Sequence, residues 1–319
     1  MRRFPLISFL AALLLLACSN TTQQAPSTEE NPVVSAVSDT IAPEELPLPQ
    51  LPATLRDPAE RAGYLIQHFW DAMNFNDTVR SHNTDFMEQN FANFVSVFPY
   101  ASEEARRGAV SALMGKASAD PEAYQLLVKI ADHYLYDPNS PMLDEETYIP
   151  FLEEFIVSPL LDESTTTRLK HQLRFARLTR PGTTTADCAY TTRDGQRKTL
   201  YTTHTEGLLL LLFYDPDCEH CQEVMPQVAS SAVLNELVGE GRLDVLAIYA
   251  DEDRELWKKT NAELPASWTV GMDTGGINEK GLYSLRALPS MYLLDTRKKV
   301  ILKDAPLNLL ENYLIDLQQ

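Results

Sequence analysis

Residues 208–214 form a run of seven apolar residues, Leu-Leu-Leu-Leu-Leu-Phe-Tyr, without a polar interruption. Such a run is typical of a strand buried on both faces, as in the centre of a parallel sheet. The turn Asp215-Pro-Asp217 ends the run, and apolar residues at helical spacing follow it. The pattern therefore predicts a strand at 208–214 and a helix at 218–238, with Cys218 in the first turn of the helix.

Strands and helices alternate around this run from about residue 181 onward. The turn Arg193-Asp-Gly-Gln196 separates two runs rich in Thr and Tyr, which predicts a hairpin before the buried strand. We expect a loop around Trp268. The other predicted elements are a strand at 243–250, a helix at about 252–263, a short helix near 276–286, strands at 290–294 and 299–304, and a closing helix at 307–317. This order predicts an α/β sandwich over residues 181–319.

Residues 57–180 instead show apolar residues at helical spacing. The segment Asp57-Pro-Ala-Glu60 has an acid at the N-cap, proline at the first helical position and glutamate at the third. Further helices are expected around Met87–Phe98, from Ser102 to about Met114, from Asp120 to Leu135, and over 145–157 and 164–178. The pattern predicts a separate all-α N-terminal domain of about six helices, serving either for partner or substrate recognition or as a scaffold.

The first 56 residues differ from both parts. Arg2 and Arg3 precede an apolar stretch at 4–17 that is too short to span a bilayer, and Cys18 follows it. This beginning resembles a bacterial lipobox, which implies a lipoprotein signal peptide at 1–17 and lipidation of Cys18. The alternatives are a plain signal peptide or a short membrane anchor. Residues 18–56 contain six prolines and no glycine, and we expect a disordered tether there.

The net charge excludes one class of binding partner, and the number of cysteines limits the roles that they can have. The formal net charge of −18 argues against nucleic acid, since phosphate binding needs a basic face. With Cys18 assigned to lipid, three of the four cysteines remain, which is too few for a disulfide framework in an exported protein. Cys218 and Cys221 form a Cys-x-x-Cys pair, and we expect Cys188 to be a buried free thiol rather than a third redox partner.

The Cys-x-x-Cys pair lies where the predicted strand meets the predicted helix. Free backbone N–H groups and the helix dipole stabilise a thiolate at such a place. A cysteine pair at this position predicts a redox site. A metal site is an alternative, but four ligands are wanted, and His204 and Cys188 are not at helpful spacing.

Residues 181–319 resemble the thioredoxin-like fold, specifically the exported TlpA-like branch of thiol-disulfide oxidoreductases. Four features carry the resemblance: the buried strand leading into Cys218-Glu-His-Cys221, Pro226 five residues later, the Leu288-Pro289-Ser290 step, and the hairpin 291–302. The helical part is similar to a domain of unknown function that precedes such modules in bacterial lipoproteins, notably in Tyr134–Pro141.

The resemblance implies roles for the site residues. Cys218 would be the nucleophile and Cys221 the resolving thiol, and the two would form the redox-active disulfide. The family implies a cis peptide at Leu288–Pro289, beside the cysteines. His220 would stabilise the thiolate.

Several nearby residues complicate these roles. The acids Glu219, Asp215 and Asp217 would oppose the thiolate that His220 stabilises. Asp217 stands where the family commonly has tryptophan, and Leu212 stands where thioredoxin has a buried acid. Proton transfer at Cys221 therefore has no evident base, and water or Glu223 are the remaining candidates.

The sequence therefore predicts a membrane-tethered thiol-disulfide oxidoreductase, acting as a reductase or isomerase on exported proteins that bear thiols or disulfides. Neither a metal nor a cofactor is implied. Because Ser19 rather than aspartate follows Cys18, the lipobox resemblance implies an outer-membrane anchor facing the periplasm, with a membrane or periplasmic redox partner. The alternatives are a non-enzymatic lipoprotein adaptor that uses the helical domain, and a thiol peroxidase. The peroxidase lacks the threonine expected just before its cysteine.

Overall fold

The structure, a computed structural model, describes residues 45–318, which form one compact unit. The predicted signal peptide at 1–17, the predicted lipidation site Cys18 and the predicted tether up to residue 44 lie outside the described residues. No helix within residues 45–318 is long and apolar enough to cross a membrane.

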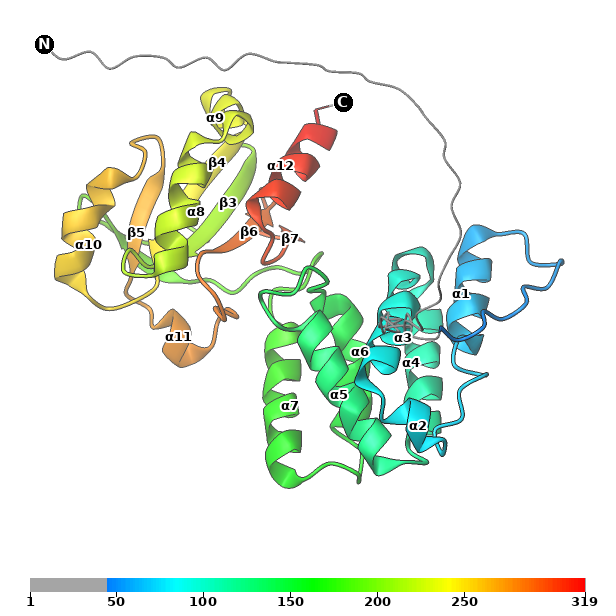
Figure 1. The fold of residues 1–319 in the computed structure, drawn as a ribbon. Coiled ribbons are helices and arrows are strands. Elements are labelled where there is room, and N and C mark those ends of the chain that lie inside the picture. Colours follow the sequence, from blue (N-terminus) through cyan, green and yellow to red (C-terminus); the bar gives the residue numbers. More distant parts are fainter. Residues whose placement is uncertain (1–44, 319) are drawn as a thin grey trace, which may run out of the picture. The chain divides into compact units, whose positions relative to one another are not determined.

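The first part of this unit is helical, as predicted (Figure 1). Its elements are α1 (Pro58–His68), α2 (Thr78–Ser81), α3 (Thr84–Ser96), a 3-10 turn (Phe98–Tyr100), α4 (Glu103–Ala117), α5 (Pro121–Leu135), α6 (Glu145–Phe155) and α7 (Glu163–Ala176). Asp57 and Asp120 cap α1 and α5 by accepting hydrogen bonds from the first free N–H groups. The helices pack around a cluster of fully buried aromatic side chains, among them Phe91, Phe94 and Phe151.

The chain enters the helical core at Leu46, which is ten residues before the predicted end of the tether at residue 56. Leu46 is buried in the helical core, and its N–H donates to Oδ1 of Asn90 on α3 at 2.8 Å. Asn90 is fully buried and donates in turn to the Phe86 carbonyl. A buried amide with both of its ends bonded fixes the path of the segment at Leu46. The predicted tether therefore does not extend to residue 56.

The second part is a seven-stranded mixed sheet with helices, which confirms the predicted α/β class. Its strands are β1 (Ala189–Thr192), β2 (Arg197–Thr199), β3 (Leu208–Tyr214), β4 (Leu243–Tyr249), β5 (Thr269–Asp273), β6 (Ser290–Leu294) and β7 (Val300–Leu302). Its helices are α8 (Glu219–Ser230), α9 (Ala232–Gly239), α10 (Arg254–Thr260), α11 (Ile277–Lys280) and α12 (Leu307–Asp316), and a 3-10 turn covers Asn261–Glu263. The strand order is β2-β1-β5-β4-β3-β6-β7, with β3 parallel to β4 and antiparallel to β6.

Strand β3 is buried on both faces, as its composition predicts. Leu210 and Leu212 pack with side chains of α8, α9 and α12, which cover one face of the sheet (Figure 1). Leu209, Leu211 and Phe213 pack on the opposite face, in a second core. Alternation of side chains along a strand places neighbouring residues on opposite faces, so a uniformly apolar sequence is needed here.

In the sheet part, one predicted helix is wrong and one strand was missed. The predicted helix 218–238 is two helices, because Ser231 has a non-helical ψ of 122° and its hydroxyl caps α9 by accepting from the Leu234 N–H. Trp268 lies in a loop, as predicted, but strand β5, which follows it directly and pairs with β4 and β1, was not predicted. Glycine at the centre of β5, Gly271, weakens the strand pattern in the sequence.

Gly271 makes room for the buried Tyr190 ring. A Cβ at this position would stand 2.3 Å from Cδ2 of Tyr190. We therefore expect Gly271→Ala to lower the free energy of unfolding by about 1–3 kcal/mol, the usual cost of overpacking a core. Urea denaturation would measure the change. The matched control is Gly239→Ala at the end of α9, where an added Cβ meets no atom within 4 Å. Equal stability of the two variants would contradict the packing argument.

Candidate active site

A short turn carries the chain from β3 to the first cysteine. Oδ1 of Asp215 accepts from the Asp217 N–H at 2.9 Å, and the Asp215 carbonyl accepts from the Cys218 N–H at 3.2 Å. Cys218 is the N-cap residue of α8, with extended backbone angles, rather than a member of the first helical turn as predicted. Its side chain is partly exposed and makes no cap hydrogen bond. The thiol therefore stands at a helix N-terminus, where free N–H groups favour negative charge.

Cys221 lies one turn further along α8 and faces the core. It is 1% exposed, and the Asp215 N–H donates to its Sγ at 3.5 Å. Burial raises the pKa of the Cys221 thiol to about 12, although the hydrogen bond from Asp215 acts in the opposite direction. One thiol of the pair is thus accessible and the other is shielded, which is what the predicted roles of nucleophile and resolving thiol require.

The Leu288–Pro289 step lies beside Cys218. The Leu288 carbonyl accepts a hydrogen bond from the Cys218 thiol, with 3.6 Å between Sγ and the oxygen. The peptide bond between Leu288 and Pro289 is cis, as the family resemblance implied. This contact brings together two motifs that are 70 residues apart in the sequence.

The charged residues of the Cys-x-x-Cys segment point away from the core. Glu219 and Asp217 are exposed. His220 lies on the surface of α8, where its Nδ1 is 3.8 Å from Oε2 of Glu223, and the two side chains are 64% and 69% exposed. An ion pair this exposed is strongly screened by water. Glu223 therefore faces His220 at the surface, whereas Cys221 is buried.

The turns after the two central parallel strands are acidic. Asp215 and Asp217 follow β3, and residues 251–253 (Asp-Glu-Asp) follow β4. Burial raises the pKa of Tyr249 to about 12, and the charges of Asp215 and of two acids in the second turn add to the effect. The carboxylates of both turns therefore act on the same end of the sheet, which gives the surface around the cysteines a negative potential.

Pro226 and Cys188 lie away from the reacting thiols. Pro226 is inside α8, as predicted, with an exposed ring. Cys188 is a buried free thiol, which confirms that prediction, and burial raises its pKa to about 12. It packs in the core on the face of the sheet opposite to Cys221.

Within residues 45–318, no group of three or more His, Cys, Asp and Glu side chains is placed to hold a metal ion.

A buried ionic cluster next to the Leu288–Pro289 step was not predicted. Arg286 Nη2 is 3.1 Å from Oε1 of Glu145 on α6 and 3.3 Å from Oδ2 of Asp304. Lys303 pairs with the other carboxylate oxygen of Glu145. These residues are scattered in the sequence, so no spacing rule brings them together. A cation two residues before the Leu-Pro step was the one available signal.

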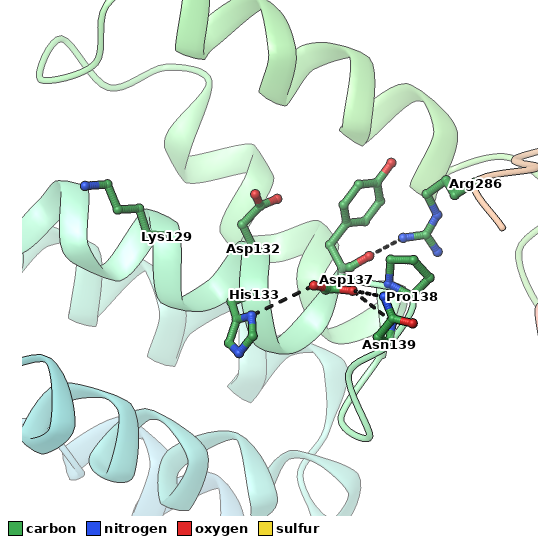
Figure 2. Close-up of a pocket in the computed structure, with 8 residues that line it drawn as sticks. Lys129, Asp132, His133, Asp137, Pro138, Asn139 and Arg286 are labelled. Carbon is green, nitrogen blue, oxygen red and sulfur yellow. Dashed lines mark hydrogen bonds and ion pairs between the residues drawn. The ribbon is translucent and has the colours of Figure 1, made fainter.

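Arg286 also borders a polar hollow on the helical part, drawn in Figure 2. Its volume is about 460 Å³. The lining residues come from the end of α5 and the following loop: Lys129, Asp132, His133, Tyr136, Asp137, Pro138 and Asn139, with Arg286. Arg286 donates to the Tyr136 carbonyl, and Figure 2 shows His133 facing Asp137, an ion pair of 4.0 Å.

Comparison with known proteins places both parts of the chain. Residues 17–178 match the model of a domain of unknown function, DUF5106. A crystal structure of a thioredoxin-like protein from Bacteroides caccae ATCC 43185 is 35% identical, with a TM-score of 0.78, and the match covers 86% of this chain and 99% of that one. No curated protein matches the chain.

Two further structures match part of the chain. The C-terminal domain of an uncharacterized protein from Bacteroides fragilis NCTC 9343 is 40% identical, covering 43% of this chain and 98% of that one, with a TM-score of 0.42. A domain of a possible thiol-disulfide isomerase from Cytophaga hutchinsonii ATCC 33406 is 22% identical, covering 44% and 95%, with a TM-score of 0.37. On the match to its helical part and the full-length likeness to the Bacteroides caccae protein, the chain belongs to the DUF5106 family and carries a thioredoxin-like module after its helical region.

Proposed function

We propose that this protein is a thiol-disulfide oxidoreductase whose reacting groups are Cys218 and Cys221. The observation that carries the proposal is the arrangement of the two thiols: Cys218 is accessible at the N-cap of α8, against the Leu288 carbonyl, and Cys221 is buried one turn behind it. The full-length likeness to the Bacteroides caccae structure, which is that of a thioredoxin-like protein, supports the same chemistry.

In the reducing direction the thiolate of Cys218 attacks one sulfur of a substrate disulfide. The substrate's S–S bond breaks, one substrate thiolate leaves and takes up a proton, and a mixed disulfide forms on Cys218. Cys221 then loses its proton and attacks Sγ of Cys218, which releases the second substrate thiol and leaves a Cys218–Cys221 disulfide. Two electrons pass from the protein to the substrate. Because the pKa of Cys221 is raised to about 12, the removal of its proton is the demanding part of this second step.

We further propose that the substrates are exported proteins bearing thiols or disulfides, and that the protein acts as a reductase or isomerase. In this proposal residues 1–17 are a signal peptide, lipidated Cys18 anchors the protein to the outer membrane facing the periplasm, and 57–180 and 181–319 are separate domains. A membrane or periplasmic partner would re-reduce the cysteine pair.

Radiolabelled palmitate incorporation that depends on Cys18, followed by membrane fractionation, would test the proposed lipid anchor.

The first prediction concerns turnover. In an insulin-reduction assay with dithiothreitol, we expect Cys218→Ser to abolish activity, since an alcohol does not exchange with disulfides at neutral pH. The matched control is Cys188→Ala, which removes a buried thiol on the opposite face of the sheet and should retain most of the activity. Unchanged turnover by Cys218→Ser would favour a non-enzymatic adaptor.

The second prediction concerns the intermediate. We expect Cys221→Ser to accumulate mixed disulfides between Cys218 and substrate proteins, because the thiol that resolves them is missing. Non-reducing electrophoresis of cell-envelope extracts, followed by mass spectrometry of the linked peptides, would show these species. The double variant Cys218→Ser/Cys221→Ser should show none, and equal trapping by both would contradict the assigned roles.

The third prediction concerns pH. In a Cys218→Ser background we expect iodoacetamide to modify Cys221 roughly a thousandfold more slowly at pH 8 in the folded protein than in urea, since only the thiolate reacts and the pKa is raised from about 9 to about 12. The folded state holds this proton more tightly than the unfolded chain. The contribution of Cys221 to stability is therefore present below about pH 9 and is lost as the pH rises toward 12. Similar rates in both states at pH 8 would contradict the burial argument.

A further inference from the structure

Arg286 connects the helical part of the chain to the segment that carries Leu288. Its guanidinium donates from Nη1 to the carbonyl of Tyr136, at the end of α5, and stands 4.1 Å from the centroid of the Tyr136 ring. Nη2 pairs with Glu145 on α6 at 3.1 Å and with Asp304 at 3.3 Å. The Arg286 side chain is only 15% exposed. One largely shielded cation thus has two partners on the helical part and one on the sheet part.

Lys303 completes this cluster. Its Nζ pairs with Glu145 and donates to the Phe175, Ala176 and Leu178 carbonyls at the end of α7. Two cations therefore face two carboxylates, Glu145 and Asp304. Removing one member of such a group leaves an uncompensated buried charge, which is costly. The cluster fixes the position of Arg286 more firmly than an exposed ion pair would.

Only a very short piece of chain connects Arg286 to the residue that contacts the reacting thiol. Leu288, whose carbonyl accepts from the Cys218 thiol, is two residues away, and two residues span at most about 7 Å. The rest of the segment is bonded to itself: the Ser290 hydroxyl donates to the Ala287 carbonyl at 2.7 Å, and the Tyr292 hydroxyl donates to the Ser284 carbonyl at 3.2 Å. From this segment, the Arg286 side chain contacts the end of α5 and Glu145 on α6.

We propose that Arg286 is a positioning residue of the redox site: held by Tyr136 and Glu145 of the helical part, it keeps the Leu288 carbonyl in contact with the Cys218 thiol. The inference rests on the proposed function of the cysteine pair. The Cys218 thiol must give up this hydrogen bond before its sulfur can attack, so the contact slows the reaction of Cys218. The helical part thereby restrains the reactivity of Cys218 without touching it.

The test is the rate at which iodoacetamide modifies Cys218 in the reduced full-length protein at pH 7, followed by mass spectrometry. We expect Arg286→Gln to raise this rate by about twofold to tenfold, the range that corresponds to the loss of one modest hydrogen bond. The matched control is Arg180→Gln, which breaks the two-pronged pair of Arg180 with Glu146, also on α6, but has no link to the Leu288 segment. Its rate should stay within about twofold of wild type.

A rate for Arg286→Gln that equals the control, or falls below it, would overturn the proposal. Circular dichroism and urea denaturation check that each variant is folded. If Arg286→Gln does not fold, Arg286→Lys replaces it, since lysine keeps the charge among the carboxylates but loses the planar fork that reaches several partners at once. An intermediate rise is expected for Arg286→Lys, and a wild-type rate would again contradict the proposal.

The part played by the helical region is tested by a double-mutant cycle with Glu145→Gln. We expect Glu145→Gln to raise the modification rate as Arg286→Gln does, and the double variant to show no further rise. Rates that multiply independently would show that Arg286 does not act with Glu145, against the proposal. Because alkylation requires no protein substrate, this result is separate from insulin reduction by the wild type, which tests the proposed function.

Discussion

The whole sheet part depends on the removal of one strand from water. Residues 209–213 of β3 are 0% exposed, with alternate side chains in two separate cores. Burying a leucine or phenylalanine side chain contributes about 1.5–3 kcal/mol, so these five contribute on the order of 10 kcal/mol, as large as the net stability of a typical domain. Since only three residues separate Tyr214 from Cys218, a strand held this firmly also fixes where the thiol can stand.

The sequence predicted this part of the molecule well, because its physical signals are local. Strand 208–214 has its predicted bounds, and the Arg193–Gln196 turn joins β1 to β2 as expected. The helix break at Ser231 was missed because a serine within an apolar helical pattern looks the same whether it caps a new helix or stays exposed on one. Strand β5 was missed because Gly271 is selected by the neighbouring Tyr190 ring, a contact that no local pattern encodes.

In the candidate site too, the features with a local sequence signal were predicted and those that depend on tertiary packing were not. The cysteine pair and the Leu288–Pro289 step are recognisable from their own residues, and the structure joins them by one contact. The ionic cluster could not be predicted, because Glu145 and Arg286 are ordinary surface residue types whose burial depends on how α6 packs. The role of His220 stays a prediction: its place in the motif suggests influence on the thiol, and the structure places it 3.8 Å from Glu223 at the surface.

The bond between Leu46 and Asn90 determines where a mechanical load would enter the molecule. Because Leu46 is buried against α3 and its N–H is held by a fully buried side chain, tension on the chain before this point passes into the helical core. Strand β3 and the turn that carries Cys218 lie on the far side of that core in the covalent order. A force on the N-terminal end would therefore have to unfold helices before it could displace the thiol.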